Sequence, residues 1–192
     1  AGNEKAMINN LGDILRNNAY KFPDELAFVF GKQRVTFSTH HDRAQNLASA
    51  IYATGVRRQD RIAVLSQNTR EFLEIYSAGE LASFIVTTVN FRLAPPEMAY
   101  ILSDSTPRIL FFEAQYGEKI ETIKAGLPHI EIYVCFGGDV PEWALSYEEF
   151  LASGDVSGAP DQPSPDDIMH LIYTSGTTGR PKGVLFDHAR AL

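Results

Sequence analysis

The pattern of apolar and polar positions predicts an opening helix, a hairpin and a second helix. Apolar residues recur at helical spacing over residues 11–22, and Pro23 ends this segment because proline cannot continue a helix. Two short β-prone runs follow at residues 26–30 and 35–37, and the polar residues between them favour a hairpin. A second helical stripe covers residues 44–51, and Gly55 stands where a left-handed C-terminal cap belongs.

Downstream, β-prone apolar runs alternate with helical stripes. The predicted strands cover residues 62–65, 84–89, 108–112 and 130–136, and the predicted helices cover residues 68–79, 95–102, 120–127 and 146–151. Asn68 with Glu71, and Ser146 with Glu149, have the spacing of capping boxes. Connections of this length imply right-handed crossovers. The sequence therefore predicts an α/β fold, with a largely parallel sheet and helices on both faces.

Composition divides the chain into three parts. Residues 7–153 form the predicted α/β subdomain, and residues 1–6 are polar and without pattern. Residues 154–167 are rich in Gly, Ser, Pro and Asp, which is typical of a linker. Residues 168–192 are expected to form a strand, a loop, a second strand and the start of a helix.

Charge and cysteine content exclude several kinds of protein. The formal net charge of −7 leaves no positive excess for a phosphate backbone, so nucleic acid is not an expected partner. Cys135 is the single cysteine and lies in an apolar run, so we expect a buried thiol without a catalytic role. No apolar run approaches the roughly 18 residues of a membrane span, and the N-terminus lacks a signal-peptide pattern. These features predict a cytoplasmic protein.

The chemistry is concentrated in one loop that follows a β-prone run at residues 168–173. The loop reads Thr174-Ser175-Gly176-Thr177-Thr178-Gly179-Arg180-Pro181-Lys182-Gly183. Its three glycines let backbone N–H groups face a ligand, its four hydroxyl side chains add donors, and Lys182 adds a positive charge. These groups suit a polyphosphate. The alternative interpretation is a flexible surface turn rich in Gly and Thr.

Other loop motifs do not fit the spacing. The glycines lack the Gly-Lys-Ser/Thr continuation of a Walker A loop, and no G-x-G-x-x-G is present. Ser175 is not a hydrolase nucleophile, because Tyr173 stands where the nucleophile elbow needs glycine. Pro181 disfavours helix at Arg180, and residues 184–186 are β-prone, so the loop is expected to join two strands.

The whole decapeptide resembles the phosphate-binding signature of the adenylate-forming (AMP-binding) superfamily, which includes acyl-CoA synthetases, aryl-CoA ligases and luciferases. Further similar segments occur in the family's order, at residues 10–24, 35–56, 60–65, 89–93 and 101–105. The resemblance covers nearly the whole chain after Met7. It implies the first part of the large N-terminal domain of an acyl-CoA synthetase, with a fatty acid as the expected substrate.

The resemblance also implies a reaction and its ligands. A carboxylate attacks the α-phosphorus of ATP to give an acyl-adenylate and pyrophosphate, and CoA then displaces AMP. The loop would hold the β- and γ-phosphates, and Mg²⁺ would share the charge with Thr174 beside it. The expected nucleotide-binding residues are Thr174, Ser175, Gly176, Thr177, Thr178, Gly179 and Lys182.

Other parts of the family's machinery are expected beyond Leu192, namely the adenine-binding segment, a metal-binding glutamate, a ribose-binding aspartate and a catalytic lysine. The isolated chain is therefore expected to be inactive. The competing hypothesis is a stand-alone nucleotide-binding or oligomerisation module without turnover, and a generic flavodoxin-like domain is a third. Strand edges left unpaired predict a homodimer or local disorder after Pro165.

Two positions depart from the family pattern. Asp187 precedes His188 where relatives often have Ser or Thr, and Asp187 is equally suited to cap a helix. His188 is interpreted either as a residue facing the active site or as a structural histidine. Thr87 and Thr88 stand where relatives usually have Val and Pro.

Overall fold

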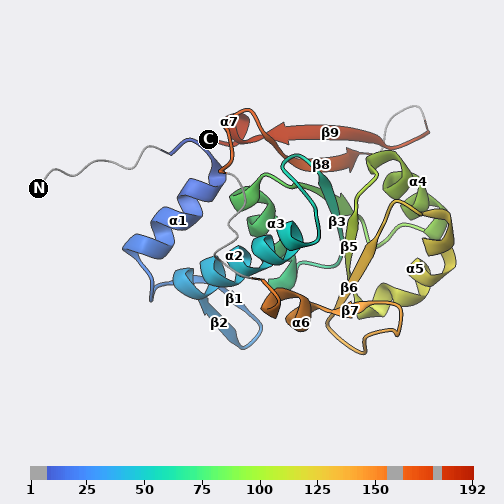
Figure 1. Ribbon diagram of the computed structural model, residues 1–192, viewed down its shortest axis with the longest axis horizontal. Helices are drawn as coiled ribbons and strands as arrows, with labels where there is room; N and C mark the ends of the chain where they lie inside the picture. Colours follow the sequence, from blue (N-terminus) through green and yellow to red (C-terminus); the bar gives the residue numbers. More distant parts are fainter. Residues whose placement is uncertain (1–7, 155–161, 175–178) are drawn as a thin grey trace, which may run out of the picture.

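The computed structural model describes residues 8–154, 162–174 and 179–192. These residues form a two-stranded hairpin and a seven-stranded sheet of order β7-β6-β5-β3-β4-β8-β9 (Figure 1). The strands are β1 (Leu26–Phe30), β2 (Gln33–Thr36), β3 (Arg61–Leu65), β4 (Ile85–Val89), β5 (Ile109–Glu113), β6 (Ile132–Phe136), β7 (Leu145–Ser146), β8 (Ile168–Thr174) and β9 (Lys182–Asp187). The helices are α1 (Leu11–Lys21), α2 (Phe37–Ala53), α3 (Arg70–Ala82), α4 (Pro95–Ser105), α5 (Gly117–Ile123), α6 (Tyr147–Ala152) and α7 (His188–Ala191), with 3-10 turns η1 (Ala114–Tyr116) and η2 (Lys124–Gly126).

The large sheet is parallel except at one edge. Strands β3 to β8 pair in parallel with their neighbours, whereas β9 pairs antiparallel with β8. Helices cover both faces of this sheet (Figure 1). The predicted α/β class is therefore confirmed, and so is the hairpin of β1 and β2.

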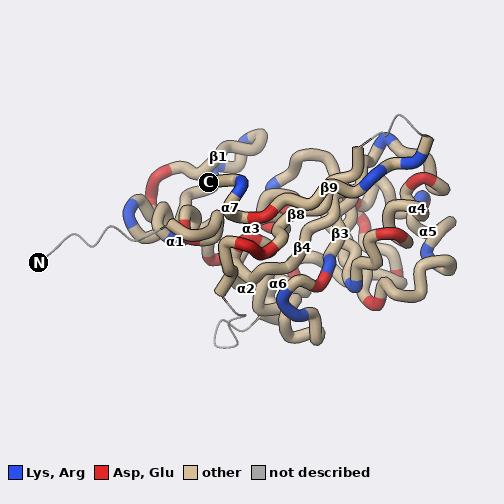
Figure 2. Tube along the Cα trace, turned by 90° about the horizontal axis from the view of Figure 1, so that it is seen from above, with Lys and Arg blue, Asp and Glu red and all other residues tan. Residues whose placement is uncertain are grey.

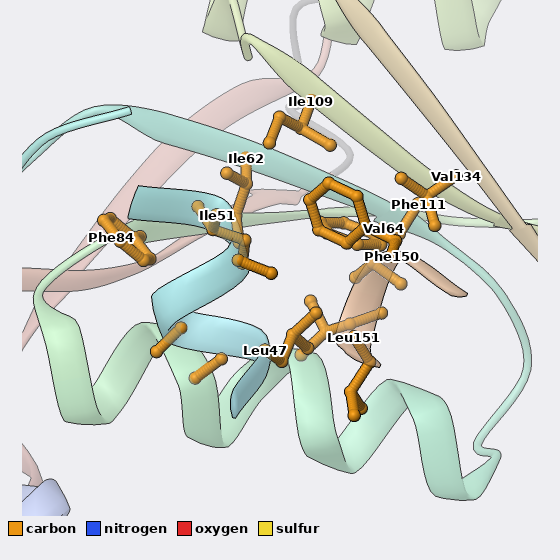
Figure 3. Close-up of a cluster of buried hydrophobic side chains, with 14 of the residues drawn as sticks. Leu47, Ile51, Ile62, Val64, Phe84, Ile109, Phe111, Val134, Phe150 and Leu151 are labelled. Carbon is orange, nitrogen blue, oxygen red and sulfur yellow. The ribbon is translucent and has the colours of Figure 1, made fainter. Parts of the chain in front are cut away.

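Two apolar layers hold the helices to the sheet. Because side chains alternate along a strand, Ile62 and Val64 of β3 join a buried cluster with α2, α3 and α6 (Figure 3). Ala63 and Leu65 point to the other face and join a second cluster with α4 and α5. All four side chains are fully buried, as expected for a central parallel strand with both faces covered.

Side-chain caps define where several helices begin. Asn10 Oδ1 accepts a hydrogen bond from Asp13 N at 2.9 Å at the start of α1. Pro95 opens α4, where a missing backbone N–H costs nothing because that group has no partner inside the helix. After α2 the chain turns at Gly55 with φ of +94°, so the predicted left-handed glycine is confirmed.

Three local predictions were wrong in detail. Phe37 begins α2 instead of ending a strand, because Thr36 Oγ1 accepts from Thr39 N at 3.2 Å and starts the helix there. The cap of α3 is Thr69, one residue after the predicted Asn68. Ser146 does precede α6, but its side chain makes no capping hydrogen bond.

The chain entering β8 is anchored by Asp167. Residues 155–161 of the predicted linker lie outside the described residues. Asp167 is buried and accepts hydrogen bonds from Ser83 Oγ at 2.6 Å, Arg58 Nη2 at 2.7 Å and Ser164 N at 2.9 Å. Burial raises the pKa of Asp167, but these hydrogen bonds outweigh it and the pKa is lowered. The three-part division of the chain stays a prediction.

Candidate functional site

The candidate site lies where the direction of the chain crossovers reverses. Helix α3, which follows β3, packs on one face of the sheet, and α4, which follows β4, packs on the other. In doubly wound sheets this reversal opens a crevice beyond the carboxyl ends of the two strands, and ligands bind there. A pocket of about 710 Å³ lies at this place, with Ser66 after β3 and Asn90 after β4 on its wall.

Both ends of the predicted phosphate loop reach this pocket region. Thr174 ends β8 and pairs in antiparallel register with Lys182, which begins β9, so the prediction that the loop joins two strands is confirmed. Thr174 and Gly179 line the pocket, whereas Lys182 is exposed outside its lining. Gly179 has φ of +91°, a left-handed conformation that favours glycine. Outside the described residues lie Ser175, Gly176, Thr177 and Thr178.

The rest of the pocket wall was missed by sequence reasoning. It comes from the ends of β3 and β4, from the segment that leads into the first turn of α3, from the loop after β4, and from α4 and β8. These lining residues are Ser66, Asn68, Phe72, Thr88, Val89, Asn90, Phe91, Arg92, Leu93, Glu97, Ile101, Ile172 and Tyr173. Polar residues directly after buried strands were a usable signal, but only the strand order shows that β3 and β4 are neighbours.

Side chains from β5 and α5 fix the pocket loops. Glu113 Oε2, at the end of β5, accepts a hydrogen bond from Gln67 N at 3.1 Å. Lys119 Nζ donates to Phe91 O at 3.0 Å and to Leu93 O at 3.1 Å. The loops after β3 and β4 are therefore held by β5 and α5, and the wall of the pocket is preformed.

The charges around the pocket favour an anion. Arg92 and Arg180 both line it, and Lys182 lies two residues beyond Arg180. Figure 2 shows the beginning of β9 in blue, close to α4. The carboxylate among the lining residues, Glu97, already accepts a hydrogen bond from Ala94 N at 2.8 Å. Positive side chains beside a cleft raise the local concentration of negatively charged ligands.

Tyr173 lines the pocket, Tyr76 contacts the lining residue Thr88, and burial favours the neutral form of both phenols. Burial raises the pKa of Tyr76, whose hydroxyl is hydrogen-bonded to Thr88 Oγ1. Burial, and then the neighbouring Asp104 carboxylate, raise the pKa of Tyr173. Neither phenol therefore adds negative charge where a phosphate would bind.

His188 is buried inside the fold and is not among the residues that line the pocket. Its side chain is fully buried, and its Nδ1 accepts a hydrogen bond from Leu11 N at 3.1 Å. Burial lowers the pKa of His188, which favours the neutral ring that can accept this bond. Asp187 caps α7 by accepting from Arg190 N at 2.8 Å, so the capping interpretation of Asp187 is confirmed.

Cys135 and the metal-ligating residue types add no further candidate site within the part of the chain that the structure describes. Cys135 is buried, as predicted, and burial raises its pKa to about 11. Within the described ranges, no group of three or more His, Cys, Asp or Glu residues is arranged to hold a metal ion. None of the helices in those ranges combines the length and apolarity needed to cross a bilayer.

The fold is a doubly wound α/β domain with a pocket where the crossovers reverse. The profile of the AMP-binding enzyme family matches residues 15–192, and the chain belongs to this family. The resemblance noted from the loop is thereby confirmed over nearly the whole chain.

The similar proteins include CoA ligases of several kinds. The chain is 37% identical over 166 residues to 3-methylmercaptopropionyl-CoA ligase of Ruegeria pomeroyi, covering 82% of this chain and 30% of the relative. It is 32% identical over 188 residues to long-chain-fatty-acid–CoA ligase of Thermus thermophilus, covering 91% of this chain and 34% of the relative. The crystal structure of the anthranilate CoA ligase AuaEII in complex with anthranoyl-AMP matches with a TM-score of 0.88 and 29% identity, covering 93% of this chain and 35% of that one. The chain therefore spans about a third of the length of these relatives.

Proposed function

We propose that this chain supplies the phosphate-binding part of an AMP-forming acyl-CoA ligase. One observation carries the proposal: Thr174 and Gly179, at the two ends of the Gly- and Thr-rich loop, border the pocket at the reversal point of the sheet. Membership of the AMP-binding enzyme family and similarity to CoA ligases support it.

In the proposed reaction, a carboxylate oxygen attacks the α-phosphorus of ATP, and the bond to pyrophosphate breaks. The CoA thiol then loses its proton and attacks the acyl carbon, and AMP leaves. The loop hydroxyls and amides would hold the β- and γ-phosphates while the leaving pyrophosphate gains charge, and the Lys182 ammonium would add electrostatic stabilisation. The residues assigned to this binding are Thr174, Ser175, Gly176, Thr177, Thr178, Gly179 and Lys182.

The proposal includes Mg²⁺ with Thr174 as one ligand. A hydroxyl oxygen is a hard donor that suits Mg²⁺, and the Thr174 residue lies on the pocket wall. Mg²⁺ keeps several waters and binds substrate phosphates, so a single protein oxygen here is compatible with it. Bound there, the ion would neutralise charge on the phosphate oxygens.

We further propose a fatty acid as the carboxylate substrate. Apolar side chains from Phe72, Phe91 and Ile101 line the pocket and support an apolar acyl group. Thermal-shift titrations of the full-length protein with acetate, benzoate and octanoate in the presence of ATP would compare the candidates. A larger shift with benzoate than with octanoate would overturn the fatty-acid assignment.

The isolated chain is proposed to bind ATP without turnover. Relatives are about three times longer, so most of their residues have no counterpart in these 192 residues. ATP–pyrophosphate exchange by the isolated chain would contradict this. A cytoplasmic location stays a prediction from composition.

Self-association of the isolated chain is also proposed. β9 lies at the edge of the large sheet, and its Val184, Leu185 and Phe186 are each more than a third exposed. Exposed edges with apolar side chains pair readily with other strands. Size-exclusion chromatography over a hundredfold range of about 1–100 μM would test this, and a monomer throughout would contradict it.

The central test is a titration with ATP of wild-type protein and Lys182→Ala. We expect Lys182→Ala to weaken binding by roughly tenfold, because a charge-assisted contact to phosphate is lost. Lys32→Ala is the matched control, because Lys32 is also exposed but lies in the turn between β1 and β2. Equal affinities of wild type and Lys182→Ala, or no ATP binding by the wild type, would overturn the proposed function.

A further inference from the structure

Helix α4 contacts the β8–β9 hairpin on both sides of the phosphate loop. On the β8 side, Tyr173 Oη donates a hydrogen bond to Asp104 Oδ2 at 2.5 Å. On the β9 side, Tyr100 Oη donates to Pro181 O at 3.4 Å. Tyr100 and Asp104 are four residues apart, so they lie on one face of the helix.

A glycine makes room for the first of these contacts. Gly183 is the cross-strand partner of Tyr173. A Cβ atom at Gly183 would lie 3.3 Å from Tyr173 Cζ and 2.8 Å from Leu171 Cδ1. The tyrosine ring therefore lies against the backbone of β9, and its hydroxyl reaches past the hairpin to α4.

The second contact involves the arginine that borders the pocket. The Arg180 guanidinium carbon lies 5.7 Å from the centre of the Tyr100 ring, within the range of a cation–π interaction. Arg180 and Pro181 both line the pocket. Tyr100 thus contacts two successive residues of the loop's second half.

The same helix is connected to the opposite wall of the pocket. α4 begins at Pro95, two residues after the lining residue Leu93. Lys119 fixes that segment through Leu93 O. α4 therefore joins the loop after β4 to the β8–β9 hairpin and can hold the two walls at a fixed separation.

We infer that Tyr100 and Asp104 are positioning residues, which hold the ends of the β8–β9 hairpin so that Thr174, Gly179 and Lys182 face a nucleotide triphosphate. This inference rests on the proposed function and names the residues that preorganise its site. Neither residue needs to contact the nucleotide, because each acts through Tyr173 or through residues 180 and 181. Preorganised donors bind phosphate better because less ordering is left to the binding step.

The test uses the full-length ligase to which this chain is proposed to belong. Four variants are compared with it: Tyr173→Phe, Asp104→Leu, Asp104→Asn and Tyr100→Phe. We expect Tyr173→Phe, Asp104→Leu and Tyr100→Phe to raise the dissociation constant of ATP by roughly fivefold to twentyfold. Each variant loses one hydrogen bond between α4 and the β8–β9 hairpin. Asp104→Asn keeps an acceptor oxygen and should bind ATP within about twofold of wild type. Tyr20→Phe is the control, because Tyr20 is 86% exposed on α1.

Two further readouts separate positioning from general stability. The KM for ATP should rise while the KM for the carboxylate and the unfolding midpoint stay near wild type. Hydrogen exchange without nucleotide should be faster at residues 179–183 in Tyr173→Phe and Asp104→Leu, with no change in β5 or β6. ATP affinities equal to wild type, or equal losses for Asp104→Asn and Asp104→Leu, would overturn the inference.

Failure of the proposed function has a different signature. If wild-type protein binds no ATP, the proposed function fails, and the exchange measurement still decides whether α4 orders the hairpin. If wild type binds ATP and Lys182→Ala weakens it while the α4 variants do not, the proposed function stands and this inference is wrong.

Discussion

The Nδ1 atom of His188 accepts a hydrogen bond at 3.1 Å from the backbone N–H of Leu11, the first residue of α1. The contact joins the N-terminal helix to the residue that follows β9. The first N–H groups of a helix have no acceptor inside the helix. The His188 imidazole supplies an acceptor for one of them. The position of α1 is therefore linked to the strand that carries Lys182.

Replacement of His188 by alanine should loosen α1. We expect a loss of about 2 kcal/mol in the free energy of unfolding, from the lost hydrogen bond and the small cavity. Hydrogen exchange should accelerate in α1 and stay unchanged in β5. Arg190→Ala, at a side chain that is 77% exposed on the same short helix, should change the stability by less than about 0.5 kcal/mol. Equal exchange in α1 of wild type and His188→Ala would contradict the prediction.

A buried carboxylate, Glu74, connects three helices. It is fully buried, accepts hydrogen bonds from Arg43 Nε at 2.6 Å and Tyr147 Oη at 2.8 Å, and lies 3.4 Å from Arg70 Nε. Glu74→Ala should cost about 3–5 kcal/mol in urea unfolding, because it leaves buried donors without their acceptor.

The matched control for Glu74 is Glu148→Ala. Glu148 pairs with the same two arginines, but its side chain is 57% exposed. Because exposed ion pairs contribute little, we expect a loss below about 1 kcal/mol. Similar losses for Glu74→Ala and Glu148→Ala would show that burial is not the decisive factor.

The stability of the protein should depend on pH through His40. Burial, and to a lesser extent the neighbouring His41, lower the pKa of His40 from 6.5 to about 4, and its Nε2 lies 2.9 Å from Ser77 Oγ. The pKa of His40 is lower in the folded state than in the unfolded state. Its contribution to stability is therefore fully present above about pH 6.5 and is lost as the pH falls toward 4.

This loss should reach on the order of 3 kcal/mol below pH 4, and urea unfolding at pH 7, 5.5 and 4 measures it. His40→Phe removes the titrating group and should make the dependence shallower. His129→Phe is the control, at a partly buried histidine whose Nε2 lies 2.9 Å from Leu102 O. An unchanged slope in His40→Phe would count against the prediction.

Gly79 permits close contact between α3 and β4. A Cβ atom there would lie 2.5 Å from Val86 Cγ2 and 2.9 Å from Phe84 O, which is backbone and cannot easily move. Gly79→Ala should therefore lower the free energy of unfolding by about 1–3 kcal/mol, despite the better helix propensity of alanine. Gly126→Ala has no heavy atom within 4 Å of its added Cβ and serves as the control. A neutral or stabilising Gly79→Ala would refute the steric argument.

Local patterns predicted most elements, and they failed where side-chain geometry decided between neighbouring residues. A helical stripe located α1, and continuous apolar runs located β3 and β6, because a packed helix face and a buried strand each leave an apolar pattern in the sequence. Asn68 and Thr69 are both good helix caps, and only the path of the backbone decides which one reaches Phe72 N. The start of α2 was misplaced for the same reason, since Phe37 is acceptable in a strand and in a helix.

The candidate site divides in the same way. Thr174, Gly179 and Lys182 were named from the decapeptide, because phosphate chemistry needs small residues, hydroxyls and a positive charge in one short segment. Their assignment to nucleotide binding stays a prediction. Asn90 and Arg92 were missed as pocket residues, because nothing local in the sequence shows that the loop after β4 faces the β8–β9 hairpin.

The sequence by itself determined the α/β class, the buried faces of the strands and the loop suited to a polyphosphate, because periodicity and residue chemistry act over a few neighbouring positions. Only the tertiary structure decided the strand order, the pocket between β3 and β4, the burial of His188 under α1 and the contact of Asp104 with Tyr173. These depend on packing between segments far apart in the chain, where many weak contacts together select one arrangement.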